Sequence, residues 1–91
     1  MDNILERYEL GLPCVLLGSP GRIVAAGEEW GDINGIDYPV SVTFATPSGI
    51  SVETGFFHLQ EITGEQLERL LEMEQIVKAH GDKPYNGLWE I

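Results

Sequence analysis

Two segments of alternating apolar and polar residues, separated by a short turn, constrain the fold of this chain most strongly. Residues 40–44 read Val-Ser-Val-Thr-Phe, residues 50–56 read Ile-Ser-Val-Glu-Thr-Gly-Phe, and Thr-Pro-Ser-Gly lies at 46–49. Successive side chains of a strand point to opposite faces, so this pattern predicts an antiparallel hairpin with one buried face. The residues expected on the buried face are Val40, Val42, Phe44, Ile50, Val52 and Phe56. Those expected in water are Ser41, Thr43, Ser51 and Glu53.

Further strands are predicted on either side of this hairpin. The apolar run 12–17 and residues 22–26 flank Gly18-Ser19-Pro20-Gly21, where Pro and Gly at the two central positions of a turn starting at Ser19 suit type II geometry. Residues 57–62 are expected to add a fifth, shorter strand. The intervening segment 27–38 has no period of 2 or 3.6, which indicates a long loop.

A helix over about 63–80 is the best specified helical element. Thr63 with Gln66 three residues later forms a capping box, and Ile62 and Leu67 form a hydrophobic staple across it. Two favourable i,i+4 pairs, Glu65–Arg69 and Glu74–Lys78, are expected to support the helix, which packs on the sheet. Residues 2–10 predict a short N-terminal helix closed by glycine, and the apolar tail 82–91 is expected to fold back on the body or to meet a partner.

The chain of 91 residues is predicted to form one domain, 1–91, of the α+β class that is mainly β. The turn in 15–24, Val-Leu-Leu-Gly-Ser-Pro-Gly-Arg-Ile-Val, and the strand in 38–44, Tyr-Pro-Val-Ser-Val-Thr-Phe, resemble SH3-like barrels of the KOW and Tudor type. They also resemble small acidic phage-encoded proteins. The resemblance covers about residues 12–62 and implies a small five-stranded SH3-like barrel flanked by the two helices. KOW domains typically carry basic residues for RNA, whereas the corresponding loop here is acidic.

The net charge of −10 excludes the common classes of nucleic-acid-binding and anionic-membrane-binding protein, because both need cations. The apolar run at 12–17 is too short to span a membrane and the N-terminus lacks a basic signal region, so a cytoplasmic protein is expected. The single cysteine, Cys14, lies inside that run and is expected to be a buried, inert thiol.

No residue pattern predicts catalysis, a cofactor or a metal. His58 and His80 stand in no catalytic motif, and His80 suits the C-terminus of a helix for electrostatic reasons. Ser19 lacks the spacing of a hydrolase nucleophile. Asp32-x-Asn34-Gly35-x-Asp37 offers oxygen ligands, but the glycine position and the missing closing Glu do not fit a calcium-binding EF-hand loop. The chain is therefore expected not to be an enzyme, although residues that converge only in the fold leave catalysis open.

The densest acidic segment surrounds a tryptophan in residues 27–38. Four acids and no basic residue flank that aromatic anchor, a combination found in protein interfaces. The residues expected to bind a partner are Glu28, Glu29, Trp30, Asp32 and Asp37. The alternative is that the acids serve solubility and that Trp30 packs under the barrel.

The leading functional hypothesis is an acidic interaction protein of phage or mobile-element origin. It would bind and inhibit a basic host protein that handles nucleic acid, such as a CRISPR-type defence nuclease complex, by imitating nucleic acid. The alternative is an oligomeric barrel, assembled through the apolar C-terminal tail, that binds a nucleotide signal or a metabolite. A third interpretation is a Tudor-like aromatic cage for a methylated cation built from Trp30, Tyr38 and an acid.

Overall fold

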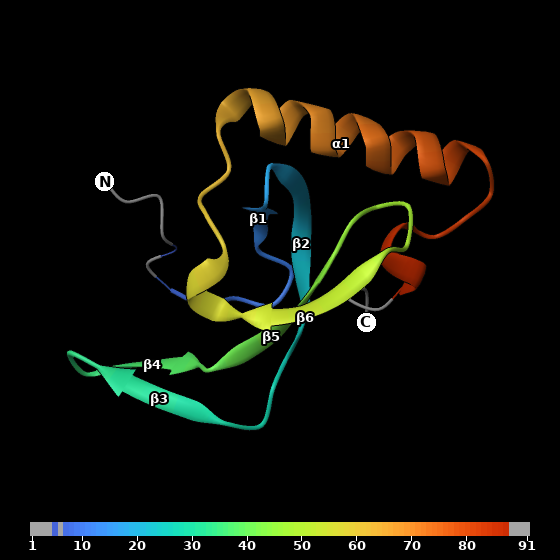
Figure 1. The fold of residues 1–91 in the computed structure, drawn as a ribbon. Helices are drawn as coiled ribbons and strands as arrows, with labels where there is room; N and C mark the ends of the chain where they lie inside the picture. The colour runs from blue at the N-terminus through green and yellow to red at the C-terminus, as the bar shows by residue number, and fades with distance from the viewer. Residues whose placement is uncertain (1–4, 6, 88–91) are drawn as a thin grey trace.

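The computed structural model describes residues 5 and 7–87, which fold mainly as antiparallel β-sheet with one C-terminal α-helix (Figure 1). The strands are β1 (Pro13–Leu16), β2 (Ser19–Ala26), β3 (Trp30–Ile33), β4 (Ile36–Pro39), β5 (Ser41–Ala45) and β6 (Ser51–Gly55). The helices are the 3₁₀ turn η1 (Phe56–His58), the α-helix α1 (Gly64–Ala79) and the 3₁₀ turn η2 (Pro84–Gly87). One sheet has the strand order β1-β2-β5-β6, and β3 and β4 form a separate two-stranded sheet.

Within the described residues these strands form no closed barrel, so the predicted five-stranded SH3-like barrel is not confirmed. The four-stranded sheet is open, with β1 and β6 at its edges. The β3–β4 hairpin extends away from the body, on the side opposite α1 (Figure 1). Residues 5 and 7–10 form no helix, so the N-terminal helix is not confirmed, and residues 2–4 and 6 of that prediction lie outside the described part.

The turn between β1 and β2 lies three residues earlier than the sequence predicts, with Leu17 and Gly18 rather than Pro20 and Gly21 at its two central positions. Leu17 and Gly18 form a two-residue turn with φ values of 50° and 82°, the left-handed geometry of a type I′ hairpin. Pro20 is therefore a strand residue opposite Val15. Counting from the pair that closes the turn, this position exchanges no hydrogen bonds with β1, so the missing N–H of the proline costs nothing.

Gly21 was also expected in the turn, but it lies within β2 for a packing reason. A Cβ atom at this position would lie 2.2 Å from the carbonyl oxygen of Ala45 and 2.6 Å from the ring of Phe44. Only glycine permits this close approach of β2 and β5.

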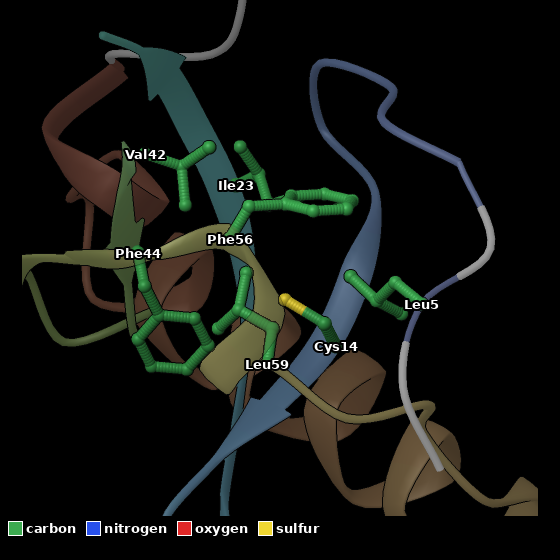
Figure 2. Packing of buried hydrophobic residues seen from close by; sticks show 7 residues of the cluster. All are labelled: Leu5, Cys14, Ile23, Val42, Phe44, Phe56 and Leu59. Atoms are coloured by element: carbon green, nitrogen blue, oxygen red, sulfur yellow. The ribbon is translucent and has the colours of Figure 1, made fainter. Parts of the chain in front are cut away.

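The main core lies on one face of the four-stranded sheet (Figure 2). It consists of Leu5, Cys14, Ile23, Val42, Phe44, Phe56 and Leu59. Cys14 is fully buried there, as the sequence predicts. A smaller cluster of Val24, Ala45 and Tyr85 involves β2, β5 and η2, and α1 contacts both β2 and η2. The sheet is thus packed on both faces.

The β5–β6 hairpin is confirmed, but its buried face is narrower than predicted. Val42, Phe44 and Phe56 are buried, whereas the exposed fractions of Val40, Ile50 and Val52 are 47%, 69% and 46%. Val40 precedes β5, and β6 is an edge strand with a neighbour on one side only, so these side chains reach the rim of the core. The predicted fifth strand over 57–62 is wrong: the chain turns through η1, and Gln60 makes a single bridge to Val15.

The segment 27–38, predicted as a loop, contains the β3–β4 hairpin instead. Asn34 and Gly35 have φ values of 56° and 81° and form a second type I′ turn between Ile33 and Ile36. Asn-Gly favours this turn because both residues tolerate left-handed backbone.

Helix α1 begins as predicted. The Thr63 side chain accepts from the Gln66 backbone N–H at 3.2 Å, and the Gln66 side chain accepts from the Thr63 N–H at 3.0 Å. The helix ends at Ala79, followed by Gly81 with a φ of 86°.

Candidate functional site

All five sequence-predicted partner-binding residues are exposed in the structure. Glu28 and Glu29 lie in the short segment that leads into β3, and Glu29 is tied to the base of the hairpin because its carbonyl accepts from the Val40 N–H at 2.8 Å. The other three residues lie within the hairpin. Alternation along β3 and the Asp32–Asp37 register place Trp30, Asp32 and Asp37 on one face.

Two carboxylates therefore face each other across the hairpin. Asp32 and Asp37 are directly opposite, and like charges at such positions destabilise a sheet. One Asp32 carboxylate oxygen accepts from the Gly35 N–H at 3.1 Å, which fixes this side chain over the turn. Among the described residues no ion pair involves either aspartate, Glu28 or Glu29. The hairpin thus presents negative charge that this part of the chain does not neutralise.

Aromatic packing anchors the base of this acidic hairpin. The Trp30 and Tyr8 rings meet edge to face with centroids 5.4 Å apart, and Tyr8 in turn contacts the buried ring of Phe56. Tyr38 packs on Phe56 at 5.4 Å. Trp30 is 47% exposed, so it neither packs fully under the sheet nor stands free. One flank of its ring contacts the body and the remainder is open to a partner.

The aromatic-cage interpretation does not fit this register. Tyr38 lies opposite Gly31, one position from the Trp30–Pro39 pair, so Trp30 and Tyr38 project from opposite faces of the hairpin. They cannot enclose one cation between them.

A buried ionic cluster that the sequence analysis missed joins β2, α1 and η2. The Arg22 Nε donates to a Glu74 carboxylate oxygen at 2.6 Å, Arg22 Nη1 donates to the Gly11 carbonyl at 3.0 Å, and the Tyr85 hydroxyl donates to Glu74. The predicted Glu74–Lys78 pairing is therefore wrong. The signal was present, because Glu74 lies four residues after Leu70 and three before Val77, on the face that the helix buries.

The environment of this cluster changes the acidity of its members. Burial and the hydrogen bond to Glu74 raise the pKa of the Tyr85 hydroxyl well above its ordinary value. Burial lowers the pKa of Arg22, but the hydrogen bond and charge of Glu74 outweigh it, so the pKa is raised overall. Tyr85 is fully buried with a φ of 60°, a left-handed conformation that costs a bulky residue about 1–2 kcal/mol. The cluster therefore has a structural role, in which it holds β2, α1 and η2 together.

The other chemically reactive groups that the structure describes do not converge. Burial raises the pKa of the Cys14 thiol to about 12, which keeps it protonated and unreactive at neutral pH. His58 lies on the surface, where its Nδ1 is 3.4 Å from the Thr54 hydroxyl, and His80 caps the C-terminus of α1. Among the described residues no group of three or more His, Cys, Asp or Glu side chains is placed to hold a metal ion.

A pocket of about 560 Å³ lies between the C-terminal end of α1 and the turn after β5. Its walls combine apolar side chains with His80, Asp82 and Lys83. None of the five predicted binding residues lines it.

In the part of the chain that the structure describes, no helix combines the length and apolar character needed to cross a membrane. Comparisons of the chain with protein-family models, with curated protein sequences and with solved structures find no match.

Proposed function

We propose that this chain is a non-enzymatic interaction protein that binds a basic protein through the β3–β4 hairpin. The observation that carries the proposal is the Asp32–Asp37 pair, two exposed carboxylates facing each other beside the half-exposed ring of Trp30. A cationic side chain that bridges the two aspartates would replace a repulsion within the free protein by two attractions.

The charge of the whole chain supports a cationic partner. At a net charge of −10, long-range attraction speeds the encounter with a basic surface and slows the encounter with an acidic one. Basic surfaces on cytoplasmic proteins commonly bind nucleic acid, and an acidic hairpin on such a surface excludes the phosphate backbone. The function proposed is therefore inhibition of a host nucleic-acid-handling protein, such as a CRISPR-type defence nuclease. The sequence resemblance to small phage proteins supports a mobile-element origin.

The test compares two variants with equal net charge. The hairpin variant carries Glu28→Gln, Glu29→Gln, Asp32→Asn and Asp37→Asn. The control variant carries Glu53→Gln, Glu61→Gln, Glu68→Gln and Glu72→Gln, four exposed acids outside the hairpin. Wild-type and variant proteins are immobilised and exposed at low salt to a nuclease-treated bacterial lysate, and retained proteins are identified by mass spectrometry.

We expect basic nucleic-acid-binding proteins on the wild type and the control, and their loss on the hairpin variant. The retained protein is then assayed for nucleic-acid binding or cleavage, which the wild type should inhibit and the hairpin variant should not. Retention by the hairpin variant equal to the control, or retention of no basic protein, contradicts the proposal.

A second candidate function rests on the pocket at the end of α1. Its volume of about 560 Å³ falls within the range of small-ligand sites, roughly 300–1,000 Å³. Lys83 and His80 give it groups that suit an anionic metabolite or nucleotide signal. In this version the protein acts as an oligomer, so a monomeric mass in solution by light scattering argues against it. The last four residues of the apolar tail expected to join subunits, 88–91, lie outside the described residues.

A further inference from the structure

The face of the β3–β4 hairpin opposite the aspartates carries an exposed apolar strip. Ile33 and Ile36 are cross-strand partners beside the turn, and Tyr38 follows Ile36 on the same face. The Tyr38 ring contacts Phe57 of η1 with centroids 5.4 Å apart. The exposed fractions of Ile33, Ile36 and Phe57 are 47%, 48% and 43%. We name these four residues, Ile33, Ile36, Tyr38 and Phe57, the apolar strip.

The strip has an open notch beside Tyr38, over Gly31. Gly31 lies opposite Tyr38, so it occupies the same face without a side chain. A Cβ atom built on Gly31 meets no heavy atom within 4 Å. An apolar side chain from outside therefore has space over Gly31, beside the Tyr38 ring and next to Ile33.

The exposed strip and the facing carboxylates do not stabilise the β3–β4 hairpin. A two-stranded hairpin in water is marginally stable, and this one exposes apolar side chains on one face and opposed carboxylates on the other. Its base is fixed by the Tyr8–Trp30 and Tyr38–Phe56 contacts, which hold the strip in one orientation. Both unfavourable features would be relieved by the same kind of partner.

Charge decides which partner fits the strip. A second copy of the chain would bring two charges of −10 together and set acidic hairpins side by side, which disfavours self-association. A basic partner is instead attracted by the negative charge of the chain. An extended segment placed along the hairpin edge points successive side chains to the two faces of the hairpin. Its apolar residues then meet the strip, while its Arg or Lys residues reach the carboxylates on the far face.

We infer that the apolar strip docks a basic segment of a partner protein in which apolar residues alternate with Arg or Lys. The apolar side chains lie on Ile33 and Ile36 and enter the notch over Gly31, while the cations reach Asp32 and Asp37. This inference rests on the proposed function, and it adds that recognition is amphipathic rather than purely electrostatic.

The test uses two synthetic peptides of equal length and charge, one alternating Arg with Val and the other alternating Arg with Ser. Binding to the isotope-labelled full-length protein is followed by NMR titration. We expect the Arg-Val peptide to bind roughly tenfold more tightly and to shift the signals of Ile33, Ile36 and Gly31. The difference between the peptides should persist when salt weakens both.

Three variants locate the effect. Ile33→Thr with Ile36→Thr removes apolar surface but keeps β-branched side chains, and should abolish the preference for Arg-Val. Ile50→Thr is the matched control, because Ile50 is exposed by 69% outside the strip, and should leave the preference unchanged. Gly31→Val fills the notch without an internal clash and should weaken the Arg-Val peptide several-fold.

Each outcome has a distinct meaning. Equal binding of the two peptides, an unchanged preference in the isoleucine variant, or tighter Arg-Val binding by Gly31→Val overturns the inference and leaves the electrostatic proposal standing. Failure of both peptides to bind at low salt counts against the proposed function itself, and the inference falls with it. A preference that requires Ile33, Ile36 and an open notch supports both.

Discussion

Single substitutions in the Arg22–Glu74–Tyr85 cluster should lower the stability of the fold strongly. Arg22 and Glu74 side chains are 15% and 8% exposed, so removing one charge breaks an ion pair that is largely shielded from water. We expect Glu74→Gln to lower the free energy of unfolding by about 3 kcal/mol or more, and Tyr85→Phe by about 1.5–3 kcal/mol. Urea unfolding measures both.

The control for this prediction is the Arg7–Glu9 pair, whose side chains are 74% and 56% exposed. Glu9→Gln should change the free energy of unfolding by less than about 1 kcal/mol, because water already solvates both charges. Comparable losses for Glu9→Gln and Glu74→Gln would show that the buried cluster contributes no more than a surface pair.

Cys14 makes the free energy of unfolding depend on pH in the alkaline range. Burial raises the pKa of its thiol from an ordinary value of 9.0 to about 12. The folded state therefore binds this proton more tightly than the unfolded state, so the contribution is complete below pH 9 and is lost as pH rises from about 9 to 12. The raised pKa of Tyr85 acts in the same direction.

We expect the free energy of unfolding to fall steeply above pH 9, and Cys14→Ala to reduce the slope between pH 9 and 11 while lowering stability at pH 7. Urea titrations at several pH values measure the slope. Identical slopes for the wild type and Cys14→Ala would contradict the assignment, because alanine has no proton to lose in this range.

At the scale of elements, the sequence predicted structure correctly where the interacting residues are close together along the chain. The α1 start followed from Thr63 and Gln66, which bond each other across one turn. The Asn34-Gly35 pair carried an equally local signal for the β3–β4 hairpin. It was obscured because the flanking segment, with glycines and exposed acids, lacks the alternation that usually marks strands.

The order of the strands within the sheet could not be predicted from such local patterns. Alternation placed Val52 on the same face as Phe44, which the register confirms, but it could not show that β6 is the edge strand where that face becomes exposed. The same limit applied to the candidate binding site on the β3–β4 hairpin. Exposure of Glu28, Glu29 and the hairpin acids could be inferred from composition, whereas the opposition of Asp32 and Asp37 needed the register.

The Asp32–Asp37 pair predicts a conflict between hairpin stability and binding. Asp37→Lys turns a like-charged cross-strand pair into an opposite-charged one, which should stabilise the hairpin by about 0.2–1 kcal/mol. The same change should weaken retention of a basic partner. Hydrogen exchange of the β3 and β4 amides measures the local stability, and the lysate assay measures binding.

Glu61→Lys provides the matched charge reversal on an exposed residue outside the hairpin. It should leave exchange of the β3 and β4 amides unchanged and should reduce binding less. Faster exchange in Asp37→Lys than in the wild type would show that the two facing carboxylates do not destabilise the hairpin in the free protein.

At the scale of the whole molecule, a net charge of −10 should make salt act in opposite directions on folding and on binding. Screening relieves repulsion among the acids of the compact state, so the melting temperature should rise between low and moderate NaCl concentrations. Screening also weakens attraction to a basic partner, so affinity should fall over the same range. Thermal unfolding and lysate retention measured in the same buffers give the two trends.

The two charge variants separate these effects. The hairpin and control variants each remove four negative charges, so both should show a flatter rise of melting temperature with salt, while only the hairpin variant loses the partner. Relief of general repulsion depends on how many acids are removed, whereas docking depends on where they lie. A melting temperature of the wild type that is insensitive to salt would show that the acids are too dispersed to repel one another, and equal loss of binding in the two variants would show that the partner responds to total charge rather than to the hairpin.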